Sequence, residues 1–178
     1  MLTFLSRLFR TLFRSGPDPR EALRPLWHRV VELSREPALY RDDGVADTVA
    51  GRFDMIAAIL ALVLLRMERD RVLGAQAALL TELFVADMDG QLRETGVGDV
   101  MVGKHVGKLM SVLGGRLGAL REALAQPDPA ALEAALARNT TMADGGGDTA
   151  ALARRLRAFY QRLCGLDSKL LLAGTFDL

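Results

Sequence analysis

Apolar residues recur at helical spacing through most of this chain. Between residues 80 and 92 they stand three or four positions apart, at Leu80, Leu83, Phe84, Met88 and Leu92, as on one face of an α-helix. Similar spacing predicts helices at about residues 19–34, 46–70, 74–94, 101–125, 130–138 and 149–166, separated by proline- and glycine-rich turns. The pattern therefore predicts an all-α fold, a single-domain helical bundle of about six to seven helices.

The most apolar stretch is MIAAILALVLL, from Met55 to Leu65. It is too short to cross a bilayer, which takes about 20 apolar residues, but it suits a helix buried on most sides. We expect the helix at about residues 46–70 to be the centre of the fold.

The first residues predict a short basic amphipathic helix. Its apolar face is formed by Leu5, Leu8, Phe9, Leu12 and Phe13, and the basic residues Arg7, Arg10 and Arg14 lie among the polar positions. Three interpretations remain open: a membrane-surface anchor, a mitochondrial targeting segment, or a first helix that packs on the core. We divide the chain into this helix (1–16), a helical core (17–143), and a C-terminal helix and tail (144–178) after the glycine-rich run Asp144 to Asp148.

Composition narrows the chemistry. Half of the 178 residues are hydrophobic and 6% are aromatic, as in a helical protein, and the net charge of +1 gives no overall field that would attract DNA. With one cysteine and two distant histidines, the sequence shows no recognisable metal-binding motif, and no cofactor is expected. The acidic cluster Asp42, Asp43 and Asp47 is interpreted as helix caps rather than metal ligands.

Two fragments imitate enzyme motifs. DMDG, from Asp87 to Gly90, is similar to the nucleophile loop of haloacid-dehalogenase-type phosphatases, but that aspartate should end a β-strand, and helix formers precede it here. GDVMVGK, from Gly98 to Lys104, fits the start of a P-loop, but His105 stands where Ser or Thr should bind magnesium. We therefore expect a non-enzyme; a small phosphate-handling enzyme built on Asp87/Asp89 or on Gly98–Lys104 is the alternative.

Asp87 falls in the middle of the apolar face of its predicted helix. Because a buried carboxylate is costly unless it is paired, we expect it to accept a hydrogen bond from Arg52, Arg93 or Lys104, or from backbone N–H groups of the following turn.

The predicted helix at residues 101–125 carries two stripes. One is an apolar seam: Val102, Val106, Leu109, Leu113, Leu117, Leu120 and Leu124. The other contains small residues: Gly103, Gly107, Ser111, Gly114 and Gly118. With Gly115, the glycines cost the helix about 4–5 kcal/mol relative to alanine. Such stripes let a second helix approach closely. We expect a tight contact within the protein; a groove for a partner's helix and a homodimer interface are the alternatives.

Three segments together carry a family resemblance: GRFD (Gly51 to Asp54), LFVADMDGQLRETGVGD (Leu83 to Asp99) and VGKHVGKL (Val102 to Leu109). They make the chain, over roughly residues 26–139, similar to the ubiquinol–cytochrome c chaperone family, the assembly factors of the cytochrome bc complex. The positions that carry the family pattern are Arg52, Phe53, Asp87, Met88, Asp89, Arg93, Gly96, Gly98, Asp99, Gly103 and Lys104.

The resemblance implies an all-helical, non-catalytic protein without cofactors. Its client would be cytochrome b or another bc-complex subunit, and relatives in mitochondria associate with the translating ribosome. The short chain looks like a bacterial relative, located in the cytoplasm or peripherally at the inner membrane, where eukaryotic relatives occupy the mitochondrial inner membrane. An assembly factor of this kind should present an apolar surface to its client.

Overall fold

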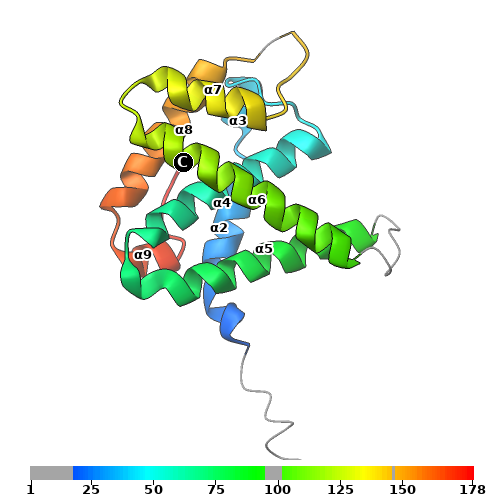
Figure 1. Cartoon of the computed structure of the whole chain (residues 1–178), viewed down its shortest axis with the longest axis vertical. Coiled ribbons are helices and arrows are strands. Elements are labelled where there is room, and N and C mark those ends of the chain that lie inside the picture. The colour runs from blue at the N-terminus through cyan, green and yellow to red at the C-terminus, as the bar shows by residue number, and fades with distance from the viewer. Residues whose placement is uncertain (1–17, 95–101, 146) are drawn as a thin grey trace, which may run out of the picture.

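The computed structural model describes residues 18–94, 102–145 and 147–178, with the side chains of 92–105 left out (Figure 1). The predicted all-α fold is confirmed, because the described residues form helices and one isolated β-bridge, Val45 with Met142. In chain order the elements are η1 (Pro19–Leu23), α2 (Arg24–Leu33), α3 (Pro37–Arg41), α4 (Val49–Glu68), η2 (Arg71–Leu73), α5 (Gly74–Glu94), α6 (Val102–Ala125), α7 (Pro129–Asn139), α8 (Thr149–Gly165) and α9 (Ser168–Leu172).

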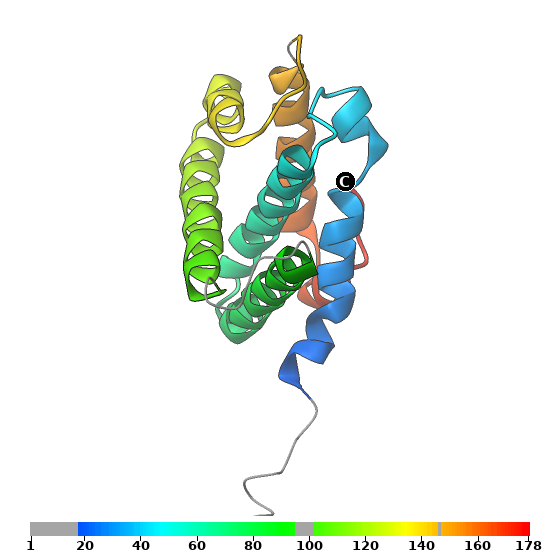
Figure 2. The same ribbon diagram turned by 90° about the vertical axis from the view of Figure 1, so that its right-hand side faces the viewer.

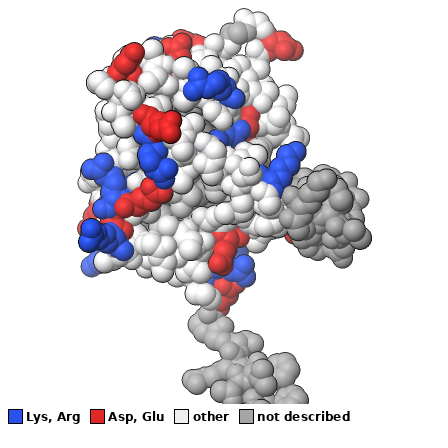
Figure 3. Space-filling view, in the orientation of Figure 1, with Lys and Arg blue, Asp and Glu red and all other residues white. Residues whose placement is uncertain are grey.

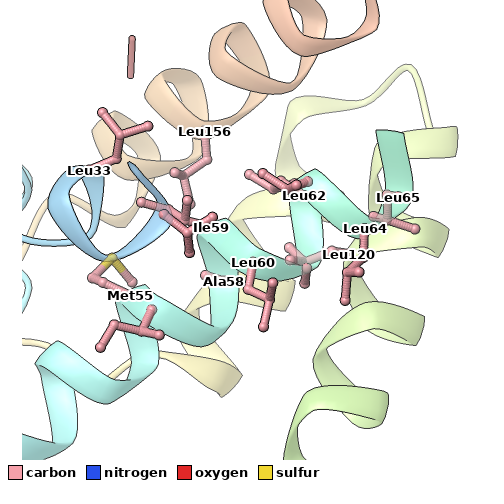
Figure 4. Packing of buried hydrophobic residues seen from close by; sticks show 14 of the residues in the cluster. Leu33, Met55, Ala58, Ile59, Leu60, Leu62, Leu64, Leu65, Leu120 and Leu156 are labelled. Atoms are coloured by element: carbon pink, nitrogen blue, oxygen red, sulfur yellow. The ribbon is translucent and has the colours of Figure 1, made fainter. Parts of the chain in front are cut away.

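Helix α4 is the centre of the fold, as the apolar run predicted. It begins after Thr48, whose side chain accepts a hydrogen bond from the backbone N–H of Gly51 at 3.2 Å, and every residue from Asp54 to Met67 is buried. Its side chains lie among Leu33 of α2, Leu120 of α6 and Leu156 of α8 (Figure 4). A helix that is apolar on all sides is stable in water only when other helices cover it in this way.

The other helices surround α4 as layers. Seen from the side, α6 stands on one side of α4, while α2 and α8 stand on the other (Figure 2). Helix α5 packs against both α4 and α6, and α7 against α6 and α8. As a result one face of α6 points away from the bundle.

The last residues of the chain contact helix α2, near the start of the described structure. Arg29 of α2 donates from Nε to the carbonyl oxygen of Phe176 at 2.6 Å and forms an ion pair with Asp177. The Phe176 ring lies 6.0 Å from that of Phe159 in α8. This C-terminal latch holds the last residues against α2 and α8.

A close backbone contact fixes the turn before α4. Gly44 has φ of +75°, and its neighbour is Gly147 of the glycine-rich run, so close that a Cβ on either residue would overlap the other's backbone. The N–H of Ala143 donates to the Gly44 carbonyl at 2.9 Å. Only glycine permits this φ and this approach together.

Three expectations about local structure are wrong. Residues 37–41 form helix α3 where Pro37 and the residues after it predict a turn. The apolar tail LLLAGTFDL, Leu170 to Leu178, predicts an extended segment, but its first residues belong to helix α9. The acidic cluster does not cap α4, because α4 begins later and Thr48 caps it. Its members form ion pairs instead: Asp43 accepts from Arg155 Nε at 2.5 Å, Asp42 from Arg41 and Asp47 from Arg52.

Candidate partner-binding site

A buried ion pair joins α4 to α6. Asp54 and Arg116 are each 8% exposed, and Arg116 Nη2 donates to Asp54 Oδ1 and to the Asn139 carbonyl, the latter at 2.8 Å. The second oxygen of Asp54 accepts from the backbone N–H and the hydroxyl of Thr141, at 2.8 and 2.7 Å. The pair therefore holds α4, α6 and the segment after α7 at one point.

The rest of the Arg116 guanidinium is less well satisfied. Its Cζ lies 5.6 Å from the centre of the Phe53 ring, which stands 6.2 Å from the ring of Phe84 in α5. Nε and Nη1 of Arg116 are buried and find no hydrogen-bond partner among the described residues. Leaving buried donors unpaired costs about 1–3 kcal/mol each, so this arginine has spare capacity for an acceptor.

Beside the pair lies an open hollow of about 500 Å³, which we call the α6–α7 hollow. Its lining comes from α4, α6 and the end of α7: Asp54, Ser111, Val112, Gly115, Arg116, Arg138, Asn139, Thr140 and Thr141. Two arginines face one carboxylate there, so the lining carries a net charge of +1.

The small residues of α6 lie on its outer face, opposite the buried Leu109, Leu113 and Leu120. We define the glycine face as Gly107, Ser111, Gly114, Gly115 and Gly118. A Cβ added at any of its four glycines would meet no atom of the described residues within 4 Å. The expected tight contact within the protein is therefore wrong for these positions. The reason is that α6 packs on the bundle through the opposite side, where Leu109, Leu113, Arg116 and Leu120 are buried.

The surface over the middle of α6 is largely uncharged. In the orientation of Figure 1, charged side chains are densest towards the left-hand edge of the molecule, and single basic side chains interrupt the white surface near the centre and the right (Figure 3). Met110, next to the glycine face, is 44% exposed. A smooth face without large side chains, bordered by an exposed methionine, suits a close contact with another helix.

The prediction of a buried carboxylate at Asp87 is wrong. Asp87 is exposed, and from the described side chains it accepts one long bond of 3.4 Å, from Gln91 Nε2. It lies at the edge of an open groove beside Trp27, His28 and Val31 of α2, and this groove leaves its carboxylate open to solvent. Of its expected partners, Arg52 pairs with Asp47 at 2.6 Å, and the side chains of Arg93 and Lys104 lie outside the described residues.

Of the remaining predicted residues, some have a described position and others lie outside the described structure. Met88 is buried in the core at 5% exposure, and Asp89 lies half-buried in α5. Asp87 and Asp89 both belong to the interior of a helix, whereas the phosphatase loop follows a strand. The following predicted residues fall outside the described structure or have no described side chain: Leu5, Arg7, Leu8, Phe9, Arg10, Leu12, Phe13, Arg14, Gly96, Gly98, Asp99 and Gly103.

Sequence reasoning missed Asp54 and Arg116. Their signal was present, since each is a charged residue inside an apolar face: Asp54 precedes MIAAILALVLL, and Arg116 stands between Leu113 and Leu120. Within the described residues, no three His, Cys, Asp or Glu side chains are grouped to hold a metal ion. None of the helices described is long and apolar enough to cross a membrane.

Comparison with known proteins identifies the family. The family model for the ubiquinol–cytochrome C chaperone matches residues 41–178. The chain belongs to this family. Family membership supports a chaperone or assembly role and favours binding over catalysis.

A solved structure supports the same assignment. The crystal structure of the Cbp3 homolog from Brucella abortus is similar with a TM-score of 0.76 and 29% sequence identity, over 97% of this chain and 95% of that one. No curated protein matches the chain. The likeness extends beyond the matched segment to include α2.

Proposed function

We propose that this protein is a non-catalytic chaperone for cytochrome b and an assembly factor of the ubiquinol–cytochrome c reductase (bc) complex. The observation that carries the proposal is the family match over residues 41–178, together with the likeness to the Cbp3 homolog. The client is cytochrome b or another bc-complex subunit, held through a helical surface and without a cofactor.

The glycine face of α6 is the surface we assign to the client. Helices of a membrane protein associate through small residues, which let two backbones approach closely. Gly107, Gly114 and Gly118 offer such a surface, since no described side chain covers them. We extend this face to Gly103 at the start of α6 on the basis of its spacing.

The protein acts near the membrane in this proposal. A newly made cytochrome b enters the bilayer as it is translated, so its chaperone works in the bacterial cytoplasm, peripherally at the inner membrane, and beside the ribosome. The N-terminal segment, with Leu5, Phe9 and Phe13 among the arginines Arg7, Arg10 and Arg14, has the composition of a membrane-surface helix.

A deletion strain tests the proposal. We expect loss of assembled bc complex and of spectroscopically detectable cytochrome b, restored by the wild-type gene. Restoration should fail with Gly114→Leu/Gly118→Leu, because leucine side chains would hold a client helix away from the α6 backbone. The matched control is Gly90→Leu, at an exposed helical glycine of α5 that is equally open. Normal cytochrome b in the deletion strain would contradict the proposed function.

The alternative of a phosphate-handling enzyme has its own test. Thermal unfolding of the purified protein would be followed with millimolar magnesium and nucleotide. A ligand that binds the folded state raises the melting temperature in proportion to its excess over Kd, and we expect no shift here.

A further inference from the structure

The α6–α7 hollow contains an unmatched positive charge. Arg116 is paired with Asp54 but keeps two buried donors, Nε and Nη1, without partners in the described structure. Arg138 is exposed at the rim and forms no ion pair within the described part of the chain. A carboxylate entering from outside would meet Arg138 at the rim, and the positive charge of Arg116 in the lining would attract it further.

The glycine face leaves the hollow open from the outer side of α6. Ser111 and Gly115 belong both to this face and to the lining of the hollow. Gly115 has no side chain, and no atom of the described residues lies within 4 Å of the place where a Cβ would stand. A side chain from a helix lying on the glycine face would therefore pass over Gly115 into the hollow.

The chain itself carries a carboxylate placed to do this. Glu122 is exposed on α6 and has no ion pair within the described residues. It follows Gly115 by seven positions, which is about two helical turns and about 10 Å along the axis. Glu122 and Gly115 thus lie on the same flank of the outer face.

We propose that two copies of this chain pair antiparallel through α6, each placing Glu122 in the α6–α7 hollow of the other. A two-fold axis across α6 near Gly118, midway between Gly115 and Glu122, brings each Glu122 level with the other copy's Gly115. This two-fold axis places the Gly115 flank of one copy and the Gly115 flank of the other on the same side of the helix pair. Each Glu122 therefore faces the α6–α7 hollow of the other copy. Gly114 and Gly118 provide the close approach of backbones, and two-fold dimers are the commonest assemblies.

The dimer is independent of the proposed chaperone function, and its formation can be measured on the purified protein without a client. It also covers the glycine face, so a second copy and a client helix exclude each other there. A dimer would protect this face until a client displaces the second copy.

The test is the mass of the purified full-length protein in sedimentation equilibrium over a range of concentrations. We expect a monomer–dimer equilibrium that reaches twice the chain mass of 19.3 kDa. Glu122→Lys should weaken the dimer about tenfold or more, since it puts a like charge beside two arginines. The control Glu82→Lys makes the same change on the exposed side of α5 and should leave the dimer unchanged.

A charge exchange distinguishes the proposed contact from a general loss of dimerisation. Combining Glu122→Lys with Arg138→Glu should restore the association, because a lysine then meets a glutamate at the rim. Circular dichroism verifies that each variant is folded. A single-chain mass at every concentration, or a dimer that tolerates Glu122→Lys, would overturn the proposed pairing. Neither result bears on the chaperone proposal. Conversely, normal cytochrome b in the deletion strain would contradict the chaperone proposal and leave the pairing standing.

Discussion

The buried pair between Asp54 and Arg116 gives the sharpest prediction about stability. In Asp54→Ala, Arg116 keeps the Asn139 carbonyl as its one hydrogen-bond acceptor among the described residues, and the N–H and hydroxyl of Thr141 lose theirs. Removing one member of a buried ion pair costs about 3–5 kcal/mol. For a chain of this size each kcal/mol lowers the melting temperature by about 2–4 °C, so we expect a fall of about 6–20 °C.

The assay is reversible unfolding by urea and by heat, followed by circular dichroism. The matched control is Glu68→Ala, which breaks the exposed pair of Glu68 with Arg121 at 2.8 Å and should cost less than about 1 kcal/mol. In the double variant Asp54→Ala/Arg116→Met the unpaired charge is gone, so it should be more stable than Asp54→Ala alone. Equal small losses for Asp54→Ala and Glu68→Ala would refute the assignment of Asp54 as the point that holds three segments together.

Three further predictions follow from the same structure. Gly114→Ala should raise the free energy of unfolding by about 1 kcal/mol, because the position is helical and open; a loss in urea unfolding would mean that the face is covered. Gly51→Ala should lower the free energy of unfolding by about 1–3 kcal/mol or more, because the new Cβ would overlap the Ala46 carbonyl. Unchanged stability in urea unfolding would contradict that packing. The pKa of Asp70 is lowered mainly by the hydrogen bond from the Ser168 hydroxyl and secondly by that from the Val72 N–H. The ionised carboxylate therefore stabilises the fold above the ordinary pKa of Asp, and this stabilisation is lost as the pH falls through the lowered pKa. Ser168→Ala should raise the pKa of Asp70 in an NMR titration, and an unchanged pKa would exclude the hydroxyl as its cause.

The helices could be predicted because their signals are local. The apolar run of α4 and the spacing of Leu80, Leu83 and Phe84 in α5 depend only on neighbouring residues. The bounds of α5 agree with the prediction, and those of α6 differ by one residue. Helix α3 was missed because Pro37 and the acidic residues after Arg41 indicate a turn equally well.

The candidate site was harder to predict because it depends on how helices overlap. A helical projection places Asp87 among apolar neighbours, but it does not show that an open groove beside α2 leaves Asp87 exposed. For Asp54 the opposite holds, since only the packing of α6 against α4 brings Arg116 to it. The glycines of α6 posed the same difficulty: their spacing shows a smooth face, and only the surrounding structure shows that no described helix lies against it.

The C-terminal latch has a consequence for the smallest fragment that can fold. The family match begins at residue 41, after α2, yet Leu26, Trp27 and Val30 of α2 are at most 3% exposed. A fragment limited to the matched residues would lose this apolar cover, and with Arg29 it would also lose the anchor of Phe176 and Asp177. Shortening the chain at one end thus releases the other, so the cooperative folding unit is larger than the segment by which the family is recognised.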